Sequence, residues 1–409
     1  MATATKTYEY AVRDAGGQLV TGTLDAASEA ALVARLKGMG YAPVSLQEKG
    51  GGTGLNREIT LPGGDRVSLK DLAVMSRQFA TMVGAGLSLV RSLAILAEQT
   101  QSKGLQKALA EVRGRVETGA SLSDSLAAHP RVFPPLMTNM VRAGEVGGFL
   151  DKVLLQVAET FEAEVKLTAK IKSAMTYPVV VFVMAILATA GMLIFIVPVF
   201  AGMFSDLGGE LPLPTQVLVV LSDVLRVGAP FLVVLAVAGA VAWGRVRHRE
   251  EVRAVVDPLK LRLPVFGTLF RKVAISRFTR NLGTMVTCGV PILQSLEIVG
   301  ATAGNVVIQR ATEDVQESVR QGQSMTAPLS RHPVFPPMVV QMLSVGEDTG
   351  AIDAMLHKIS EFYDQEVEST TEALTALIEP LMIAVLGSVI GAMIIALYMP
   401  IFSVFELIE

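Results

Sequence analysis

The chain has 409 residues, of which 51% are hydrophobic and only 18% are charged. That composition excludes an ordinary soluble protein of this length and predicts segments that cross a membrane. The net charge of −3 argues against a general affinity for nucleic acid, and the single cysteine, Cys288, excludes an internal disulfide.

Residues 1–49 are predicted to form a small α/β domain at the start of the chain. Alternating side chains indicate strands at 7–12 and 19–24. Ser28 is the predicted N-cap of a helix, which a third strand follows. Residues 50–67 begin with a glycine-rich run, which is typical of a flexible linker.

Residues 68–172 are predicted to form a cytoplasmic helical bundle. It begins at Ser68, whose spacing to Asp71 matches a capping box. Apolar side chains then recur at helical spacing, and glycines and prolines divide the segment into about six helices. The last of these helices continues toward a membrane span.

Three apolar runs predict three transmembrane helices. Residues 179–200 and 381–404 are 22 and 24 residues without a charge, and each exceeds the roughly 20 residues that a helix needs to cross a bilayer. The run 228–243 is shorter and spans only if Arg226 snorkels to the interface; otherwise it is a buried core helix. The predicted spans, from first to third, are residues 176–200, 222–244 and 379–404.

The chain repeats itself, which makes the middle span necessary. Residues 129–135 recur as 332–337, and Gly144-Glu145 recurs as Gly346-Glu347. The offset is 203 at the histidines (332 − 129) and 202 at the glutamates (347 − 145). Such a duplication predicts two structural copies, with the second in the cytoplasmic segment 245–375. Two copies that enter the membrane in the same direction need a return helix between them.

Basic residues near the spans predict the orientation. Lys170 and Lys172 precede the first span, and Arg245 and Arg247 follow the second, whereas the loop 201–216 has neither Lys nor Arg. The loop is therefore predicted to be external. Both bundles and the N-terminus are then cytoplasmic, and the C-terminus is external.

Most repeated motifs have a structural interpretation. Pro130 and Pro333 are expected to end helices, and the histidines before them, His129 and His332, to lie at helix C-termini, where a cationic side chain is favoured. The paired prolines that follow are expected to begin the next helices. Two further prolines are expected to mark kinks where cytoplasmic helices enter the bilayer; these are Pro178 and Pro380.

The acidic residues of the repeat allow two interpretations. Glu145 and Glu347 fall near predicted helix C-termini, where a carboxylate opposes the helix dipole. Asp151 and Asp353 follow at matching positions, in the first turn of the next helix. One interpretation is a turn stabilised by backbone hydrogen bonds. The other is an interface at which these carboxylates contact a partner or a cation.

Gly387 and Gly391 form a GxxxG motif in the third span, which permits close approach of a second helix.

The sequence lacks recognisable catalytic, nucleotide-binding and metal-binding motifs. The dipeptide Gly-Lys of a Walker A loop does not occur, and four histidines and one cysteine form no metal-ligand pattern. The sequence therefore predicts a scaffold, neither an enzyme nor a cofactor-binding protein.

Several further motifs, taken with the His-Pro and Gly-Glu pairs, point to a known family. They are residues 77–87 with their repeat at 280–290, then 119–126, 172–178 and 209–215. Together they resemble the family of type II secretion protein F and its type IV pilus counterpart PilC, over nearly the whole chain. The second copy departs from the pattern at residues 323–325 and at Glu379, which replaces a tyrosine.

The resemblance implies a mainly α-helical, polytopic platform in the bacterial inner membrane. It implies that the cytoplasmic domains meet a hexameric secretion or pilus ATPase, that pilin-like subunits and other inner-membrane assembly proteins are partners, and that the protein forms homo-oligomers. The basic stretch 245–280 is expected to face either a partner or anionic lipid headgroups. The alternatives are a subunit of a small-solute transporter, which three spans without midplane charges disfavour, and a membrane signalling adaptor.

Overall fold

The computed structural model describes residues 6–13, 19–26, 29–39, 42–48, 67–206, 211–247, 249–264 and 266–408. The chain folds as two compact units, Met1–Gly64 and Asp65–Glu409. The predicted linker 50–67, apart from its last residue, and the predicted cap Ser28 lie outside the described residues.

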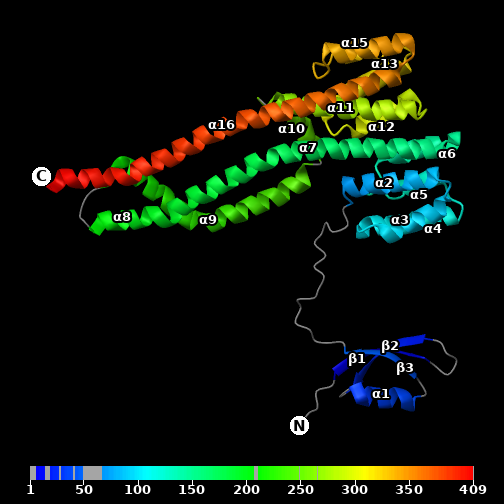
Figure 1. Cartoon of the computed structure of the whole chain (residues 1–409), viewed down its shortest axis with the longest axis horizontal. Coiled ribbons are helices and arrows are strands. Elements are labelled where there is room, and N and C mark those ends of the chain that lie inside the picture. The colour runs from blue at the N-terminus through cyan, green and yellow to red at the C-terminus, as the bar shows by residue number, and fades with distance from the viewer. Residues whose placement is uncertain are drawn as a thin grey trace. The chain divides into compact units, whose positions relative to one another are not determined.

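The first unit contains strands β1 (Lys6–Arg13), β2 (Leu19–Ala26) and β3 (Ala42–Glu48) and helix α1 (Glu29–Gly38). Both neighbours of β1 are antiparallel to it, in the order β2-β1-β3 (Figure 1). Leu32 and Leu36 lie one helical turn apart on α1, and both are fully buried. One face of the helix therefore supplies the apolar core of this small unit.

The first copy of the repeat consists of six helices, of which the last is by far the longest. In chain order they are α2 (Leu69–Gly84), α3 (Leu89–Gln99), α4 (Lys103–Glu117), α5 (Leu122–Ala127), α6 (Pro135–Gly147) and α7 (Leu150–Gly191). The predicted capping box at the start of α2 is confirmed. Ser68 Oγ accepts from the Asp71 N–H at 3.1 Å, and Asp71 Oδ2 accepts from the Ser68 N–H at 3.2 Å. The prediction that paired prolines begin helices is also confirmed at Pro135.

The second copy has the same order of helices, preceded by one extra helix. The extra helix is α10 (Glu250–Arg262), and the copy itself comprises α11 (Phe266–Thr287), α12 (Ile292–Thr302), α13 (Val306–Arg320), α14 (Thr326–Leu329), α15 (Pro337–Thr349) and α16 (Ile352–Ile408). In each copy the first helix packs along the long last helix: α2 along α7, and α11 along α16 (Figure 1).

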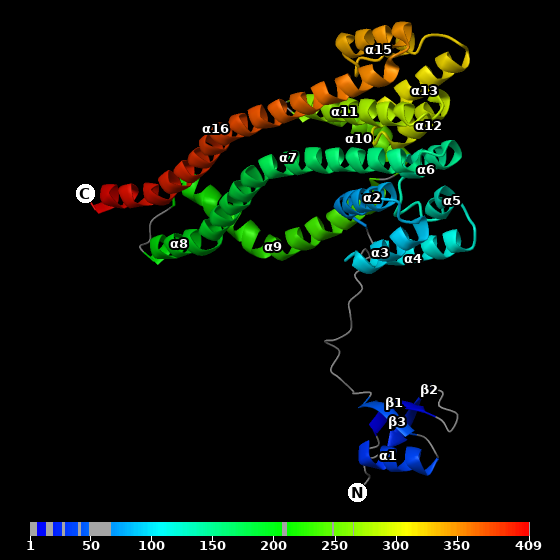
Figure 2. The ribbon, with the colours of Figure 1, turned by 45° about the vertical axis from the view of Figure 1, so that its right-hand side comes forward.

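The two copies share one apolar core and do not form separate bundles. Buried side chains of both copies belong to a single cluster, which includes Phe79 and Phe161 of the first and Phe278 and Leu343 of the second. The long helices α7 and α16 lie side by side in both views (Figures 1 and 2). Duplication thus produced two halves of one unit, because the apolar faces of the halves cover each other.

Two described helices are long and apolar enough to cross a membrane, Leu150–Met203 and Ile352–Pro400. The first combines α7, a π-helical turn (η1, Met192–Ile196) and the start of α8 (Val197–Asp206). A third span results if both halves of α9 (Leu213–Val246) form one, although they meet at a bend of 59°. Pro230 falls in that bend, and a proline lacks the N–H that a continuous helix needs.

The connection between the first two apolar segments differs in length from the prediction. It is shorter than the predicted loop 201–216, because α8 continues to Asp206 and α9 begins at Leu213, after a proline at its N-cap. Pro178 and Pro380, at which kinks were predicted, both lie inside continuous helices. Each long helix therefore joins the shared core directly to an apolar segment.

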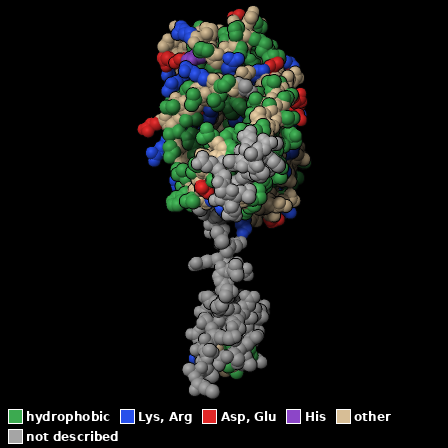
Figure 3. Space-filling model, turned by 90° about the vertical axis from the view of Figure 1, so that its left-hand side faces the viewer, with side chains coloured by type: hydrophobic (Ala, Val, Ile, Leu, Met, Phe, Trp, Pro, Cys, Tyr) green, Lys and Arg blue, Asp and Glu red, His purple; other side chains and the backbone are tan. Residues whose placement is uncertain are grey.

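The apolar segments expose their side chains, as expected for a surface that faces lipid. Phe182, Met184 and Ile383 are each more than half exposed. Figure 3 shows the molecule from the end that holds α8. Hydrophobic side chains cover much of the helical unit in this view, and charged side chains gather in its upper part. A small buried cluster, which includes Leu193 and Met393, joins the segments of α7 and α16.

Candidate functional site at the repeated helix junctions

Glu145 forms the junction between α6 and the short helix α5. Its two carboxylate oxygens accept hydrogen bonds from the backbone N–H groups of Leu122, at 2.5 Å, and Ser123, at 3.0 Å. Ser121 Oγ accepts from the next N–H, that of Asp124, at 3.1 Å. The first turn of a helix has no internal partners for these donors, so the two side chains together satisfy the N-terminus of α5.

Glu347 forms the equivalent junction in the second copy. Its Oε1 accepts from the Met325 N–H at 3.0 Å, and its Oε2 accepts from Ser324 Oγ at 2.6 Å. The second backbone donor of the first copy, the Ser123 N–H, has its equivalent in the Thr326 N–H, which donates to Ser324 Oγ at 3.1 Å instead of to the carboxylate. The carboxylate still lies at the N-terminus of a short helix, where the helix dipole favours negative charge.

These contacts bear on the two interpretations of the repeated acids. Both glutamates are engaged within the chain, which favours the backbone hydrogen-bonded turn over a cation or partner contact. No group of three or more His, Cys, Asp and Glu side chains suited to a metal ion occurs among the described residues. Asp151 and Asp353 lie in the first turns of α7 and α16, where the sequence places them.

The glycine of each Gly-Glu pair allows two helices to cross closely. A Cβ added to Gly144 would lie 3.0 Å from Val153 Cβ and 3.1 Å from Leu150 Cα. A Cβ on Gly346 would lie 3.0 Å from Met355 Cγ and 3.1 Å from Ile352 Cα. A larger side chain would therefore require neighbouring atoms to shift where α6 rests on the start of α7, and where α15 rests on the start of α16.

His129 and His332 have acidic partners that the sequence interpretation missed. His129 Nε2 lies 3.4 Å from Glu111 Oε2 on α4, and His332 Nε2 lies 2.8 Å from Asp314 Oδ2 on α13. Each histidine follows the short helix of its copy, and Pro130 and Pro333 come directly after it. The sequence repeat could have indicated these partners, because the two acids, like the two histidines, are 203 residues apart (314 − 111).

An arginine joins the first helix of each copy to its last. Arg77 on α2 donates from Nε and Nη2 to Glu162 on α7, at 2.7 and 2.6 Å, in the two-bond geometry typical of strong Arg–carboxylate pairs. These hydrogen bonds lower the pKa of Glu162 and raise that of Arg77. In the second copy Arg280 on α11 pairs with Asp364 on α16. The two arginines are the first residues of the repeated motifs 77–87 and 280–290, but the motifs do not identify their partners.

The interface between the copies is also polar in places. Thr160 Oγ1 and Thr284 Oγ1 lie 3.2 Å apart in the buried interface, and Arg277 Nη2 lies 3.2 Å from Glu164 Oε1. Nearer the membrane segments, Lys170 on α7 pairs with Glu368 on α16. These contacts fix the lateral position of one long helix against the other.

Gly387 and Gly391 lie on a part of α16 that nothing else in the described chain covers closely. A Cβ added to either glycine would meet no heavy atom within 4 Å. This face of the helix is therefore open within the chain.

The fold and its junctions define a duplicated helical membrane protein, in which two bundles with a shared core continue into long apolar helices. The family described as type II secretion system (T2SS), protein F, matches residues 75–198 and 278–400, and its N-terminal domain matches residues 1–47. The starts and ends of the two matches are offset by 203 (278 − 75) and 202 (400 − 198), which confirms the duplication. The chain belongs to the type II secretion system protein F family.

Curated relatives cover nearly the whole chain. The chain is 43% identical over 399 residues to the type IV pilus assembly protein PilC of Thermus thermophilus, covering 97% of this chain and 98% of the relative. It is 42% identical over 406 residues to PilC of Myxococcus xanthus, covering 98% and 95%. It is 31% identical over 404 residues to type II secretion system protein F of Vibrio cholerae, covering 98% and 99%. The resemblance seen in the sequence motifs is thereby confirmed.

Proposed function

We propose that this protein is the inner-membrane platform of a type IV pilus or type II secretion machine. In this role it couples a cytoplasmic assembly ATPase to the insertion of pilin-like subunits into a filament, without catalysing a reaction itself. The observation that carries the proposal is the continuity of α7 and α16 from the shared core into the apolar segments. Relatives named for pilus assembly and for type II secretion support the same role.

Coupling of this kind needs elements that move as one body. At 1.5 Å per residue, α7 and α16 are about 63 and 86 Å long. The parts of both helices that precede the apolar segments are held by the shared core. A separate apolar cluster, which includes Leu167, Leu269 and Val367, also joins α7, α11 and α16. A displacement of the bundles relative to the membrane would therefore move the spans as well.

The proposal includes three spans, with the bundles and N-terminus in the cytoplasm and the C-terminus outside. It requires both halves of α9 to form the return helix. Lys and Arg residues before the first span and after the second support this orientation, since such residues are enriched on the cytoplasmic side. It also includes self-association, for which the open Gly387–Gly391 face of α16 is one available surface.

The partners are tested by cross-linking intact cells and identifying what co-purifies with the protein in mild detergent. Recovery of a hexameric ATPase together with pilin-like subunits and other inner-membrane assembly proteins is the expected result. Recovery of a solute-binding protein, or of signalling proteins alone, would contradict the platform role and support the transporter or adaptor.

The coupling is tested separately by interrupting α7 between core and span. Three glycines inserted after Ala174 should abolish filament assembly, because they uncouple the bundle from the membrane helix, while the ATPase still co-purifies. The control is the same insertion after Gly52, in the predicted linker. Normal assembly with the α7 insertion would show that this helix does not transmit the movement.

A further inference from the structure

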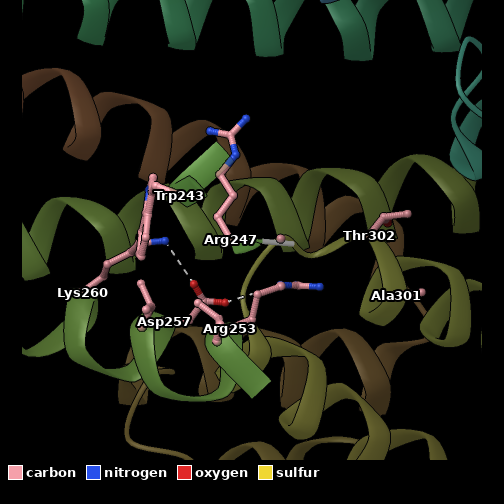
Figure 4. Close-up of a pocket in the computed structure, with 10 residues that line it drawn as sticks. Trp243, Arg247, Arg253, Asp257, Lys260, Ala301 and Thr302 are labelled. Carbon is pink, nitrogen blue, oxygen red and sulfur yellow. Dashed lines mark hydrogen bonds and ion pairs between the residues drawn. The ribbon is translucent and has the colours of Figure 1, made fainter. Parts of the chain in front are cut away.

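A cleft of about 580 Å³ lies where the second copy meets the end of α9. Its walls come from the last residues of α9, from α10, and from the connection between α12 and α13. Figure 4 shows Lys260 and Arg253 on the two sides of the Asp257 carboxylate, with Arg247 extending away from them. None of the junctions described above contributes a side chain to this cleft.

The cleft is positively charged. Its lining includes three cations, Arg247, Arg253 and Lys260, and one carboxylate, Asp257, which leaves a net charge of +2 (3 − 1). No other Asp or Glu side chain is part of the lining. An anion that enters therefore meets an excess of positive charge.

Asp257 is a buried residue of the cleft, and its negative charge is balanced by hydrogen-bond donors and cations. It is 3% exposed and accepts hydrogen bonds from Lys260 Nζ at 3.1 Å and from the Val306 N–H at 3.2 Å. Arg253 Nε lies 3.7 Å from its Oδ2. Since one buried carboxylate holds two of the three cations, these are prepositioned, and little conformational entropy is lost when they bind a ligand.

Trp243 indicates the depth of the cleft relative to the membrane. It is the one tryptophan of the chain and is 51% exposed, three residues before the end of α9. Tryptophan is enriched at membrane–water interfaces. If α9 is the return span proposed above, Trp243 lies at its cytoplasmic interface, and the cleft that it lines lies next to the lipid headgroups.

We propose that this cleft binds the phosphate-bearing headgroup of an anionic phospholipid. The N–H donors of a guanidinium group point in directions that suit two oxygens of one phosphate, and a lysine adds a compact positive charge. Basic pockets at the cytoplasmic ends of spans suit such headgroups, and Trp243, an interfacial residue type, is part of the lining of this pocket. Because Asp257 also caps α13, the bound lipid connects the bilayer to the second copy but not to the first.

The proposal is tested by measuring lipid binding to the full chain. The purified protein in nanodiscs of phosphatidylcholine is titrated with phosphatidylglycerol, for the wild type and for Arg247→Gln/Lys260→Gln. At about 1 kcal/mol for each basic residue near an anionic surface, the variant should bind roughly thirtyfold more weakly. The control, Lys107→Gln/Arg115→Gln on α4, removes the same charge from the first copy and should bind like the wild type.

Two results would overturn the proposal. One is equal affinity of the cleft variant and the wild type while thermal unfolding shows both to be folded. The other is displacement of the lipid by inorganic phosphate at comparable concentration, which would make free phosphate the ligand. Neither result depends on filament assembly, so failure here is distinguishable from failure of the platform role.

Discussion

The two copies have equivalent polar junctions, but the side chains of these junctions differ in how far they are exposed to solvent. The first copy joins its first and last helices through Arg77, whose side chain is 37% exposed, whereas the second uses Arg280, which is 8% exposed. The second pair also includes Ser276, whose hydroxyl donates to Asp364 Oδ1 at 2.6 Å. Both copies therefore retain the Arg–carboxylate junction. How much the loss of this junction destabilises the protein depends on how deeply it is buried in each copy.

A second difference concerns how each copy is tied to the rest of the chain. The N-terminus of α4 is capped by its own Ser102, whose Oγ accepts from the Leu105 N–H. The equivalent end of α13 is capped by Asn305 and also by Asp257 from α10. Among the contacts of the described residues, the one from Asp257 thus joins the second copy to α10, the helix that follows α9.

The largest difference between the copies is expected from removing the two arginines. Arg280→Ala leaves Asp364 without its buried partner and should destabilise the protein by about 3 kcal/mol. Arg77→Ala should cost less than about 1 kcal/mol, because the pair is partly exposed to water. Denaturant unfolding of the purified protein in detergent measures both. Arg320→Ala, at an exposed pair within α13, is the control, and equal losses for Arg280 and Arg77 would contradict the comparison.

The close helix crossings should respond next. Gly144→Ala should cost about 2 kcal/mol, because the new methyl meets the β-branched Val153 and a backbone atom. Gly346→Ala should cost about 1 kcal/mol, since Met355 adapts more easily. Gly114→Ala, inside α4 with no atom near its added Cβ, should stabilise the protein by up to about 1 kcal/mol. Thermal unfolding would refute this account if all three variants shifted in the same direction.

The glutamate caps should give a smaller difference. Glu145→Ala removes the acceptor of two backbone N–H groups and should cost about 1–2 kcal/mol, whereas Glu347→Ala should cost about 1 kcal/mol. Glu98→Ala, on an exposed part of α3, should change stability by less than about 0.5 kcal/mol. A further variant, Glu145→Gln, decides the partner interpretation: a pull-down that recovers as much partner as the wild type would exclude a direct contact there.

The smallest effect is expected from pH. Arg77 lowers the pKa of Glu162 below its ordinary value of 4.5, so this pair contributes stability above the pKa of the unfolded state. That contribution is lost as the pH falls through the lower, folded-state pKa. Unfolding measured from pH 7 to pH 3 should show a smaller loss for Glu162→Gln than for the wild type. Identical pH profiles would mean that the pair contributes no measurable stability.

Features set by short stretches of sequence were predicted well. The capping box at Ser68 and the helix start at Pro135 need only neighbouring residues, because a helix end is satisfied by side chains one turn away. The kinks expected at Pro178 and Pro380 stay a prediction. Each proline lies inside a continuous helix, and a helix can continue through a proline while it bends there.

The sequence by itself determined the duplication, the apolar runs and the family, because repetition, length and composition are properties of the chain. The tertiary structure decided which side chains meet: Glu145 with the start of α5, His332 with Asp314, and Arg77 with Glu162. It also merged the two copies into one core and brought the Asp257 carboxylate of α10 to the Val306 N–H at the start of α13. Contacts between helices depend on which faces are buried together, and that choice is made by the free energy of the whole fold rather than by any local segment.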